Sequence, residues 1–223
     1  MTIVHSDMGL YIDLKENIVN VVVVENKRML SNLTNELYIQ CNGGYGEFVL
    51  AEKDKLFKFS EKVVFVPEPF SISCNDKKIL SLLHKELCNE ALDNLYEETS
   101  SINSAVANYM ENLVSRLPYP ITFSDDLDIL GLLKLMHISF DDYSETLCEK
   151  IINYIKILSS LTKFNTIVFL NLKAFLDDWE LKEVYKIAFY NKMHIVLIES
   201  YLYDKLDNEN TIIFDKDLCV IEF

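Results

Sequence analysis

The sequence predicts a mixed α/β fold, with a head built from both ends of the chain and an α-helical leg inserted between them. Apolar, β-branched runs typical of buried strands occur towards both ends, for example at residues 18–24 and 166–170. In the middle of the chain, apolar residues recur at three- and four-residue steps, which indicates helices. We therefore expect a discontinuous head of residues 1–74 and 142–223 and a helical leg of residues 75–141.

The first third of the chain predicts strands with one helix between them. The run at 18–24, IVNVVVV, is expected to be a central strand covered on both faces, and residues 25–37 a short helix after it. The glycine-rich residues 42–46 are expected to form a hairpin turn, because glycine supplies the positive φ angles that such turns need. Residues 53–59 and 63–66 are expected to be strands.

The middle of the chain predicts four helices. The first begins at Asn75 or Asp76, and a second continues its apolar stripe to Leu117, just before a proline. Ser124 is expected to cap a third helix and Ser144 a fourth. These helices follow one another with few strand-like residues between them, so we assign most of them to the leg.

The last quarter predicts one βαβ unit followed by a hairpin. Residues 166–170 and 195–198 are expected to be parallel strands, with a helix over about 177–191 between them. Residues 211–214 and 218–221 are expected to pair as a closing hairpin.

The composition is that of a globular protein with a substantial core. Half of the 223 residues are hydrophobic, and 5 Gly and 4 Pro are too few for a disordered chain. The 21 Lys and Arg residues against 35 Asp and Glu give a net charge of -14, which by itself argues against a nucleic-acid binder. Neither a secretion signal nor an apolar run near the roughly 20 residues that cross a bilayer is apparent, so we expect a cytoplasmic protein.

The segment after the predicted central strand lacks a phosphate-binding loop. Residues 25–28, Glu-Asn-Lys-Arg, offer no glycine to let backbone amides converge on a phosphate, and the carboxylate would repel one. The four histidines stand apart, outside any catalytic motif. We therefore expect no catalytic residue and no nucleotide cofactor, although Lys27 can meet a phosphate electrostatically, which leaves an unconventional nucleotide hydrolase open.

Two acidic clusters flank the predicted third helix and are the most site-like feature of the sequence. Grouped carboxylates are what calcium or magnesium requires, whereas Asp at a helix start is also ordinary capping. Both interpretations stay open here. The candidate metal ligands are Asp125, Asp126, Asp128, Asp141, Asp142 and Glu145.

Three stretches together resemble the Csn2 family, the accessory proteins of spacer acquisition in subtype II-A CRISPR systems. The longest is residues 158–199, which includes the segment Asn-Leu-Lys-Ala-Phe-Leu after a predicted strand. The others are residues 21–33 and residues 70–87, where the head passes into the leg. The resemblance runs in order over nearly the whole chain.

The resemblance implies a head similar to a RecA-like ATPase of the P-loop NTPase class, degenerate in its nucleotide site, plus a helical leg. It further implies a homotetrameric ring that binds the ends of double-stranded DNA, with calcium, in a hole lined by lysines, in antiviral defence. Such a ring is not an enzyme. The net charge of -14 allows this, because counterion release depends on local phosphate contacts rather than on total charge.

The resemblance transfers unevenly to individual residues. Asp125 and Asp126 match the family's calcium ligands, but Ile121 and Gly131 stand where further carboxylates would be expected. Either the other acidic candidates substitute, or this member has lost the ion. The DNA-contact candidates are the basic residues after the predicted central strand and in the densest basic run of the chain, whose spacing can place several on one strand face. They are Lys27, Arg28, Lys53, Lys55, Lys58 and Lys62.

Two alternatives to DNA contact also follow from the sequence. Lysines on an edge strand can simply keep it soluble. The acidic composition also fits an adaptor that docks the spacer integrase or the effector nuclease and makes little DNA contact of its own.

Overall fold

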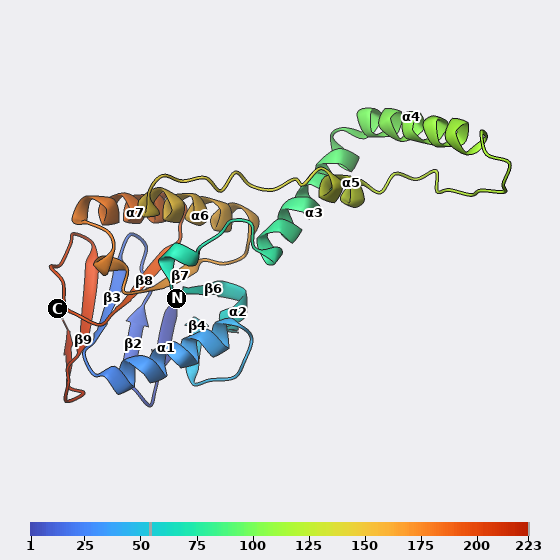
Figure 1. Cartoon of the computed structure of the whole chain (residues 1–223). Coiled ribbons are helices and arrows are strands. Elements are labelled where there is room, and N and C mark those ends of the chain that lie inside the picture. The colour runs from blue at the N-terminus through green and yellow to red at the C-terminus, as the bar shows by residue number, and fades with distance from the viewer. Residues whose placement is uncertain (54, 223) are drawn as a thin grey trace. The chain divides into compact units, whose positions relative to one another are not determined.

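The computed structural model describes every residue except Asp54 and Phe223, and it divides into two compact units (Figure 1). The head comprises Met1–Cys74 and Asp142–Phe223, and the leg comprises Asn75–Asp141. None of the helices in the described part of the chain is long and apolar enough to span a membrane.

A six-stranded sheet forms the centre of the head, in the order β10-β9-β3-β8-β7-β6. All neighbours are parallel except β10, which pairs antiparallel with β9. The predicted central strand is confirmed, because every residue of β3 is buried and β8 and β9 flank it. The strands are β3 (Val19–Val24), β6 (Val63–Val66), β7 (Thr166–Leu170), β8 (His194–Glu199), β9 (Glu209–Phe214) and β10 (Val220–Glu222).

A second, antiparallel sheet in the order β2-β1-β4-β5 packs beside the first. Neither β1 nor β2 was predicted from the sequence, because each has only four residues and alternates buried with more exposed positions. Their buried apolar residues join one core with alternate residues of β3, β8 and β9. The strands are β1 (Thr2–His5), β2 (Leu10–Asp13), β4 (Phe48–Glu52) and β5 (Lys55–Phe57).

Helices cover both faces of the six-stranded sheet (Figure 1). On one face, α1 (Lys27–Cys41) contributes Leu33 and Leu37 to the core shared with the second sheet. The other face is covered by α6 (Leu147–Leu161) and α7 (Asp178–Tyr190), which pack against each other. The head therefore has helices on both sides of a mostly parallel sheet, as expected for an α/β fold.

The helix after β3 is longer than the sequence suggested, and this corrects two expectations. It continues to Cys41 instead of ending at residue 37, and residues 43–46 connect a helix to a strand instead of turning a hairpin. Glycine is needed where the chain folds back on the helix. A Cβ atom on Gly44 would lie 2.4 Å from Ile39 Cγ2, and Gly43 has a φ of +88°.

The predicted strand at 53–59 is also corrected. Only β5, Lys55–Phe57, is extended, and a one-turn helix α2 (Phe59–Lys62) precedes β6. The turn buries Phe59 in the core, where its ring lies 5.7 Å from that of Phe48. The residues after β5 thus bury an aromatic ring in the core, which stabilises the turn between β5 and β6.

The leg consists of three helices, α3 (Lys77–Asp93), α4 (Tyr96–Val114) and α5 (Ile129–Leu135). Asp76 caps α3, which confirms one of the two residues, Asn75 and Asp76, at which the sequence predicted this helix to begin. The cap predicted at Ser124 is wrong, because α5 starts only after Asp128. Of the leg's residues, all of which the structure describes, Ile79 alone is buried.

The last quarter of the head agrees closely with its sequence pattern. Asp177 accepts hydrogen bonds from the first turn of α7, and Glu180 completes a capping box. The closing hairpin is confirmed as β9 paired with β10. The helix before this region, α6, is capped by Thr146 and not by Ser144 as expected.

Candidate nucleic-acid interface

Lys27 and Arg28 lie at the first turn of α1, immediately past the carboxyl end of β3. Both are exposed. Only Glu25 and Asn26 connect the strand to the helix, and Asn26 Oδ1 accepts hydrogen bonds from the backbone N–H groups of Arg28 and Met29 at 3.1 Å. In a phosphate-binding loop, backbone N–H groups at this position would donate to the phosphate. Here they donate to the Asn26 side chain instead.

A hollow of about 530 Å³ opens beside Arg28 at this end of the sheet. Its volume falls in the range of small-molecule sites, and ligands of open α/β sheets bind outside the carboxyl ends of the strands. Its walls combine acidic, basic and apolar side chains. They are Asp7, Met8, Asn26, Arg28, Met29, Asn32, Phe214 and Leu218.

The four lysines of the basic run do not share one strand face, contrary to expectation. Lys53 lies in the turn after β4 with a φ of +53°, and Lys55 begins β5. Lys58 precedes α2 with 80% of its side chain exposed, 3.9 Å from Glu61. Lys62 ends α2, where Nζ lies 5.6 Å from the centre of the Phe57 ring and 3.5 Å from the Lys163 carbonyl oxygen.

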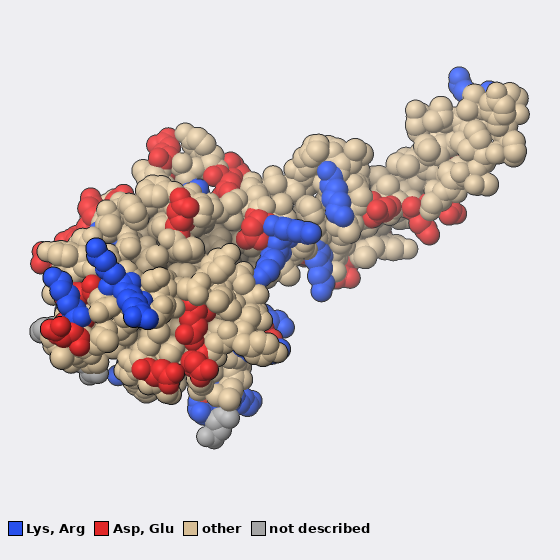
Figure 2. Space-filling model, turned by 60° about the horizontal axis from the view of Figure 1, so that its bottom comes forward, with Lys and Arg blue, Asp and Glu red and all other residues tan. Residues whose placement is uncertain are grey.

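The two basic groups are separated along the head. The basic run lies near the carboxyl end of α1, because Phe59 packs on Phe48 and the Phe48 carbonyl oxygen accepts a hydrogen bond from the Gln40 side chain. Lys27 lies at the opposite end of that helix. A helix of 15 residues is about 22 Å long. On the head, Figure 2 shows the blue basic side chains in separate groups, with red carboxylates between them. On the face of the head that Figure 2 shows, the cations are therefore scattered rather than gathered in one continuous basic patch.

The acidic candidates of the leg lie before and at the start of α5. Asp125 and Asp126 are exposed, and the Asp126 N–H donates to Ser124 Oγ at 3.3 Å. Asp128 is the residue before α5, and a Cβ atom at Gly131 would lie 2.5 Å from its Oδ2. Glycine at 131, where the resemblance led us to expect a carboxylate, thus leaves room for the Asp128 side chain.

The other acidic candidates lie around the return of the chain from the leg to the head. Asp141 is the last residue of the leg. Asp142 Oδ2 accepts hydrogen bonds from Ser73 Oγ at 2.8 Å and from the Cys74 N–H at 3.1 Å, so it joins the two chain segments at this point of the head. Glu145 donates its N–H to Glu149 Oε2 at 3.0 Å.

The described residues contain no group of three or more His, Cys, Asp or Glu placed to hold a metal ion. The structure thus does not bring the six acidic candidates into one ligand set within a single copy. Calcium stays a prediction from the resemblance.

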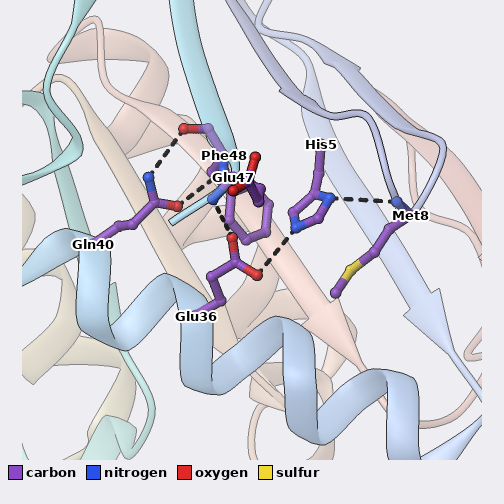
Figure 3. Close-up of polar contacts among 6 residues, drawn as sticks. All are labelled: His5, Met8, Glu36, Gln40, Glu47 and Phe48. Atoms are coloured by element: carbon purple, nitrogen blue, oxygen red, sulfur yellow. Dashed lines mark hydrogen bonds and ion pairs between the residues drawn. The ribbon is translucent and has the colours of Figure 1, made fainter. Parts of the chain in front are cut away.

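A polar cluster that was not predicted from the sequence fixes α1 to the second sheet (Figure 3). The buried His5 receives the Met8 N–H at Nδ1 (3.3 Å), so Nε2 carries the proton and donates to Glu36 Oε2 at 3.1 Å. The Glu47 N–H donates to the other oxygen of Glu36. Burial opposes ionisation of Glu36, but these hydrogen bonds outweigh it and hold the pKa of the carboxyl below its ordinary value. The alternation of Ile3 and His5 in β1 is the signal that could have placed His5 inward.

A second unpredicted cluster lies on the opposite face of the six-stranded sheet. Lys173 Nζ forms a buried ion pair with Glu209 at 2.8 Å, and the Tyr185 hydroxyl donates to the same carboxylate at 2.7 Å. The Lys173 N–H donates to Glu199 Oε1 at 3.0 Å. These bonds join the loop after β7, the end of β8 and the start of β9.

Comparison with known proteins decides the family. The model of the CRISPR-associated protein family Cas_Csn2 matches residues 40–218 of the chain. The chain belongs to the Csn2 family of CRISPR-associated proteins. The match includes Lys53 to Lys62 and every acidic candidate, whereas Lys27 and Arg28 lie outside it.

One sequence relative of this Csn2-family protein agrees with the assignment, and one solved structure has a similar fold. The chain is 26% identical over 170 residues to the CRISPR-associated protein Csn2 of Streptococcus agalactiae, covering 72% of each chain. Its fold is similar to that in the crystal structure of Stu0660 of Streptococcus thermophilus, with a TM-score of 0.63 at 15% identity, covering 100% of this chain and 76% of the other. The family resemblance drawn from the sequence is therefore confirmed, and the fold extends over the whole chain.

Proposed function

We propose that this Csn2-family protein binds the ends of double-stranded DNA without sequence preference and supports spacer acquisition in type II-A CRISPR immunity. The observation that carries the proposal is family membership over residues that include the exposed lysines of the β4–β5 turn and β5. Binding needs no catalysis, so we propose a non-enzymatic role in the cytoplasm.

The strand order supports a RecA-like origin of the head. Counted along the chain, the parallel strands β3, β6, β7, β8 and β9 lie in the spatial order 5-1-4-3-2. This is the order of a RecA-like core, in which the phosphate loop follows the first strand. Here that position holds the two-residue connection capped by Asn26. We infer a degenerate nucleotide site, because the amides that would bind phosphate are already hydrogen-bonded.

Self-assembly into a homotetrameric ring would resolve the scattered charge. One head offers two separate cationic groups, at Lys27–Arg28 and at Lys53–Lys62, and its total charge repels DNA. Several copies around one duplex would direct these groups at a shared set of phosphates. Affinity then follows the number of phosphates neutralised, not the net charge.

The leg supplies the physical reason to assemble. Its helix α4 has no buried residue, although Ile102, Val106, Tyr109 and Leu113 form one apolar stripe with exposed fractions between 41% and 64%. Exposed stripes of this kind mark interaction surfaces. We propose that the stripe is covered by other copies in the ring.

Calcium is part of the proposal with Asp125 and Asp126 as the first ligands. A calcium ion takes six to eight oxygen ligands, more than the described carboxylates of one copy bring together. We therefore propose that Asp128, or the residues Asp141, Asp142 and Glu145, complete the site in the assembled protein.

Replacement of lysines tests the DNA interface. We expect Lys53→Gln with Lys55→Gln to weaken binding to a linear duplex and to reduce the slope of affinity against salt, by about one unit for each phosphate that is no longer neutralised. The matched control, Lys156→Gln with Lys182→Gln, changes the net charge equally on exposed positions of α6 and α7. An equal decrease in affinity in both variants would show that only total charge matters and would contradict the interface.

A second candidate function, an adaptor for the integrase or effector nuclease, is favoured by the separation of the cationic groups. Pull-down of either purified protein in the presence of DNase distinguishes the two. An association bridged by DNA disappears under DNase, whereas a direct protein contact persists.

A further inference from the structure

Exposed aromatic rings gather where the loops leave the carboxyl ends of β6, β7 and β8. Phe70 follows β6, Phe175 and Trp179 follow β7, and Tyr201 follows β8, with exposed fractions of 54%, 49%, 68% and 65%. These strands are parallel neighbours, so their loops emerge side by side, with successive strands about 4.8 Å apart. We call Phe70, Phe175, Trp179, Tyr201 and Tyr203 the edge surface.

Four of the five rings of the edge surface contact one another in two pairs. The ring centres of Phe70 and Phe175 are 5.1 Å apart at an interplanar angle of 78°, and those of Tyr201 and Tyr203 are 5.5 Å apart at 80°. Both are edge-to-face arrangements, which are favourable for aromatic pairs. The first pair joins loops that are about a hundred residues apart in the sequence, so local sequence order does not explain it.

Buried and capped contacts hold these loops in place. Asn171, in the left-handed region with a φ of +51°, accepts the Ser200 N–H at Oδ1 (2.8 Å) and donates its own N–H to the Ile198 carbonyl oxygen (2.8 Å). The buried Lys173 donates to Glu209 and to the Asp204 carbonyl oxygen at 3.1 Å. The loops after β7 and β8 are thereby fixed to each other.

The backbone that carries the remaining two rings, Phe70 and Trp179, is fixed as well. Lys150 Nζ donates to the Phe70 carbonyl oxygen at 2.8 Å, and the Asp177 capping box fixes the turn that carries Trp179. Loops whose backbone is already fixed lose less entropy on binding than flexible ones. The backbone that carries the edge surface is therefore pre-organised for a ligand.

The charges around the edge surface select the kind of partner. The carboxylates of Asp177, Asp178 and Asp204 are exposed beside the rings, and Glu68 precedes the turn that carries Phe70. Of the nearby cations, Lys173 is buried in an ion pair and Lys150 is bonded to a carbonyl oxygen. Lys182 and Lys205 are exposed, but the four carboxylates of Glu68, Asp177, Asp178 and Asp204 outnumber them. The acidic rim repels nucleic acid, and it equally disfavours a second copy of the same surface.

We propose that the edge surface docks a segment of a partner protein that carries Arg or Lys beside an aliphatic or aromatic anchor. The cation would lie over the Trp179 or Tyr201 ring near a rim carboxylate, and the anchor would contact the Phe70–Phe175 pair. Tryptophan and tyrosine are enriched among the residues that dominate interface energies, and cations bind aromatic faces. This docking function is independent of DNA binding.

Trp179 is the sole tryptophan of the chain, so its fluorescence reports directly on the edge surface. The probe is a short peptide of alternating Arg and Leu, without aromatic residues, titrated into the full-length protein. We expect its binding to change the Trp179 emission, and we expect Phe175→Ala with Tyr201→Ala to weaken that binding at least about tenfold, the equivalent of one hot-spot residue. The control Tyr190→Ala, 86% exposed at the far end of α7, is expected to leave the affinity unchanged.

Three comparison ligands keep the test specific. Binding should be abolished with a Glu–Leu peptide and strongly reduced with an Arg–Ser peptide, which has the charge but no anchor. Equal binding of the Arg–Ser peptide would reveal a purely electrostatic contact and overturn the proposal. A short DNA duplex titrated without the peptide that changes the Trp179 emission of the wild type, but not that of Phe175→Ala with Tyr201→Ala, would assign the edge surface to nucleic acid, which also overturns it. All substituted positions are exposed, and circular dichroism verifies that each variant folds.

Discussion

Glu199 ends β8 with its carboxylate buried, and its Oε2 atom has no hydrogen-bond partner among the described residues. Burial raises the pKa of this carboxyl to about 7, although the Lys173 N–H and ammonium act in the opposite direction. The ordinary value is 4.5, so the folded protein binds this proton more tightly than the unfolded chain. The contribution of Glu199 to stability therefore falls as the pH rises from about 4.5 to about 7.

Glu199→Gln should remove this pH dependence. At pH 8 the variant is expected to be more stable than the wild type, by up to about 3 kcal/mol for a shift of this size. At pH 5 the difference should be small, because the wild-type carboxyl is then mostly protonated in the folded state. Urea unfolding of both proteins across this pH range measures the difference. The control Glu61→Gln changes an exposed carboxyl, and a difference as large there would contradict the assignment.

Lys173→Met should destabilise the head, because it leaves Glu209 buried without its cation. Removal of one partner of a buried ion pair costs about 3–5 kcal/mol, and both side chains here are almost fully buried. Adding Glu209→Gln to this variant should restore part of the stability, since the uncompensated charge is gone. Urea unfolding quantifies both variants. A double variant no more stable than Lys173→Met would show that impaired packing, rather than the unpaired charge, dominates.

At the scale of elements, the leg differs from the head in having almost no core of its own. The stripe of α4 is expected to contact other copies. Val106→Glu with Leu113→Glu should therefore lower the mass in solution, measured by light scattering, because the new carboxylates would be buried between copies. Ser104→Glu with Asn108→Glu adds the same charge at exposed positions outside the stripe and should leave the mass unchanged. If both variants keep the wild-type mass, the stripe does not join the copies.

Elements with long or uniform patterns could be predicted from the sequence. β3 is apolar throughout except for Asn20, and α7 opens with an acidic capping box, so both were found. The residues from 38 to 62 were predicted poorly, because burial of Phe59 and the return of the chain over Ile39 depend on distant parts of the fold. Tertiary contacts override local propensity in such segments.

Site residues were less predictable than elements, for a physical reason. Exposed lysines are visible in a sequence, but whether they face a common ligand depends on how the copies assemble. Lys173 and Glu209, which form a buried ion pair, are 36 residues apart in the sequence. No local sequence pattern could therefore indicate that they meet. The Csn2 resemblance therefore carried more of the functional prediction than any motif did.

At the scale of the whole molecule, DNA binding depends on assembly to concentrate cations that one head holds apart. The protein has a net charge of -14, so a monomer in solution should bind DNA weakly and only at low salt. A tetramer with the lysines directed at a central duplex would bind more tightly and show a steep dependence on salt.

The most direct test compares the affinity for a linear duplex with that for a closed circle of the same sequence, over a salt series with calcium or with a chelator. A ring that accepts DNA through its ends should bind the linear form far more tightly, with a clear salt slope, and calcium should strengthen that binding. Equal affinity for the two forms would contradict binding at DNA ends. A salt-independent affinity would contradict the lysine interface.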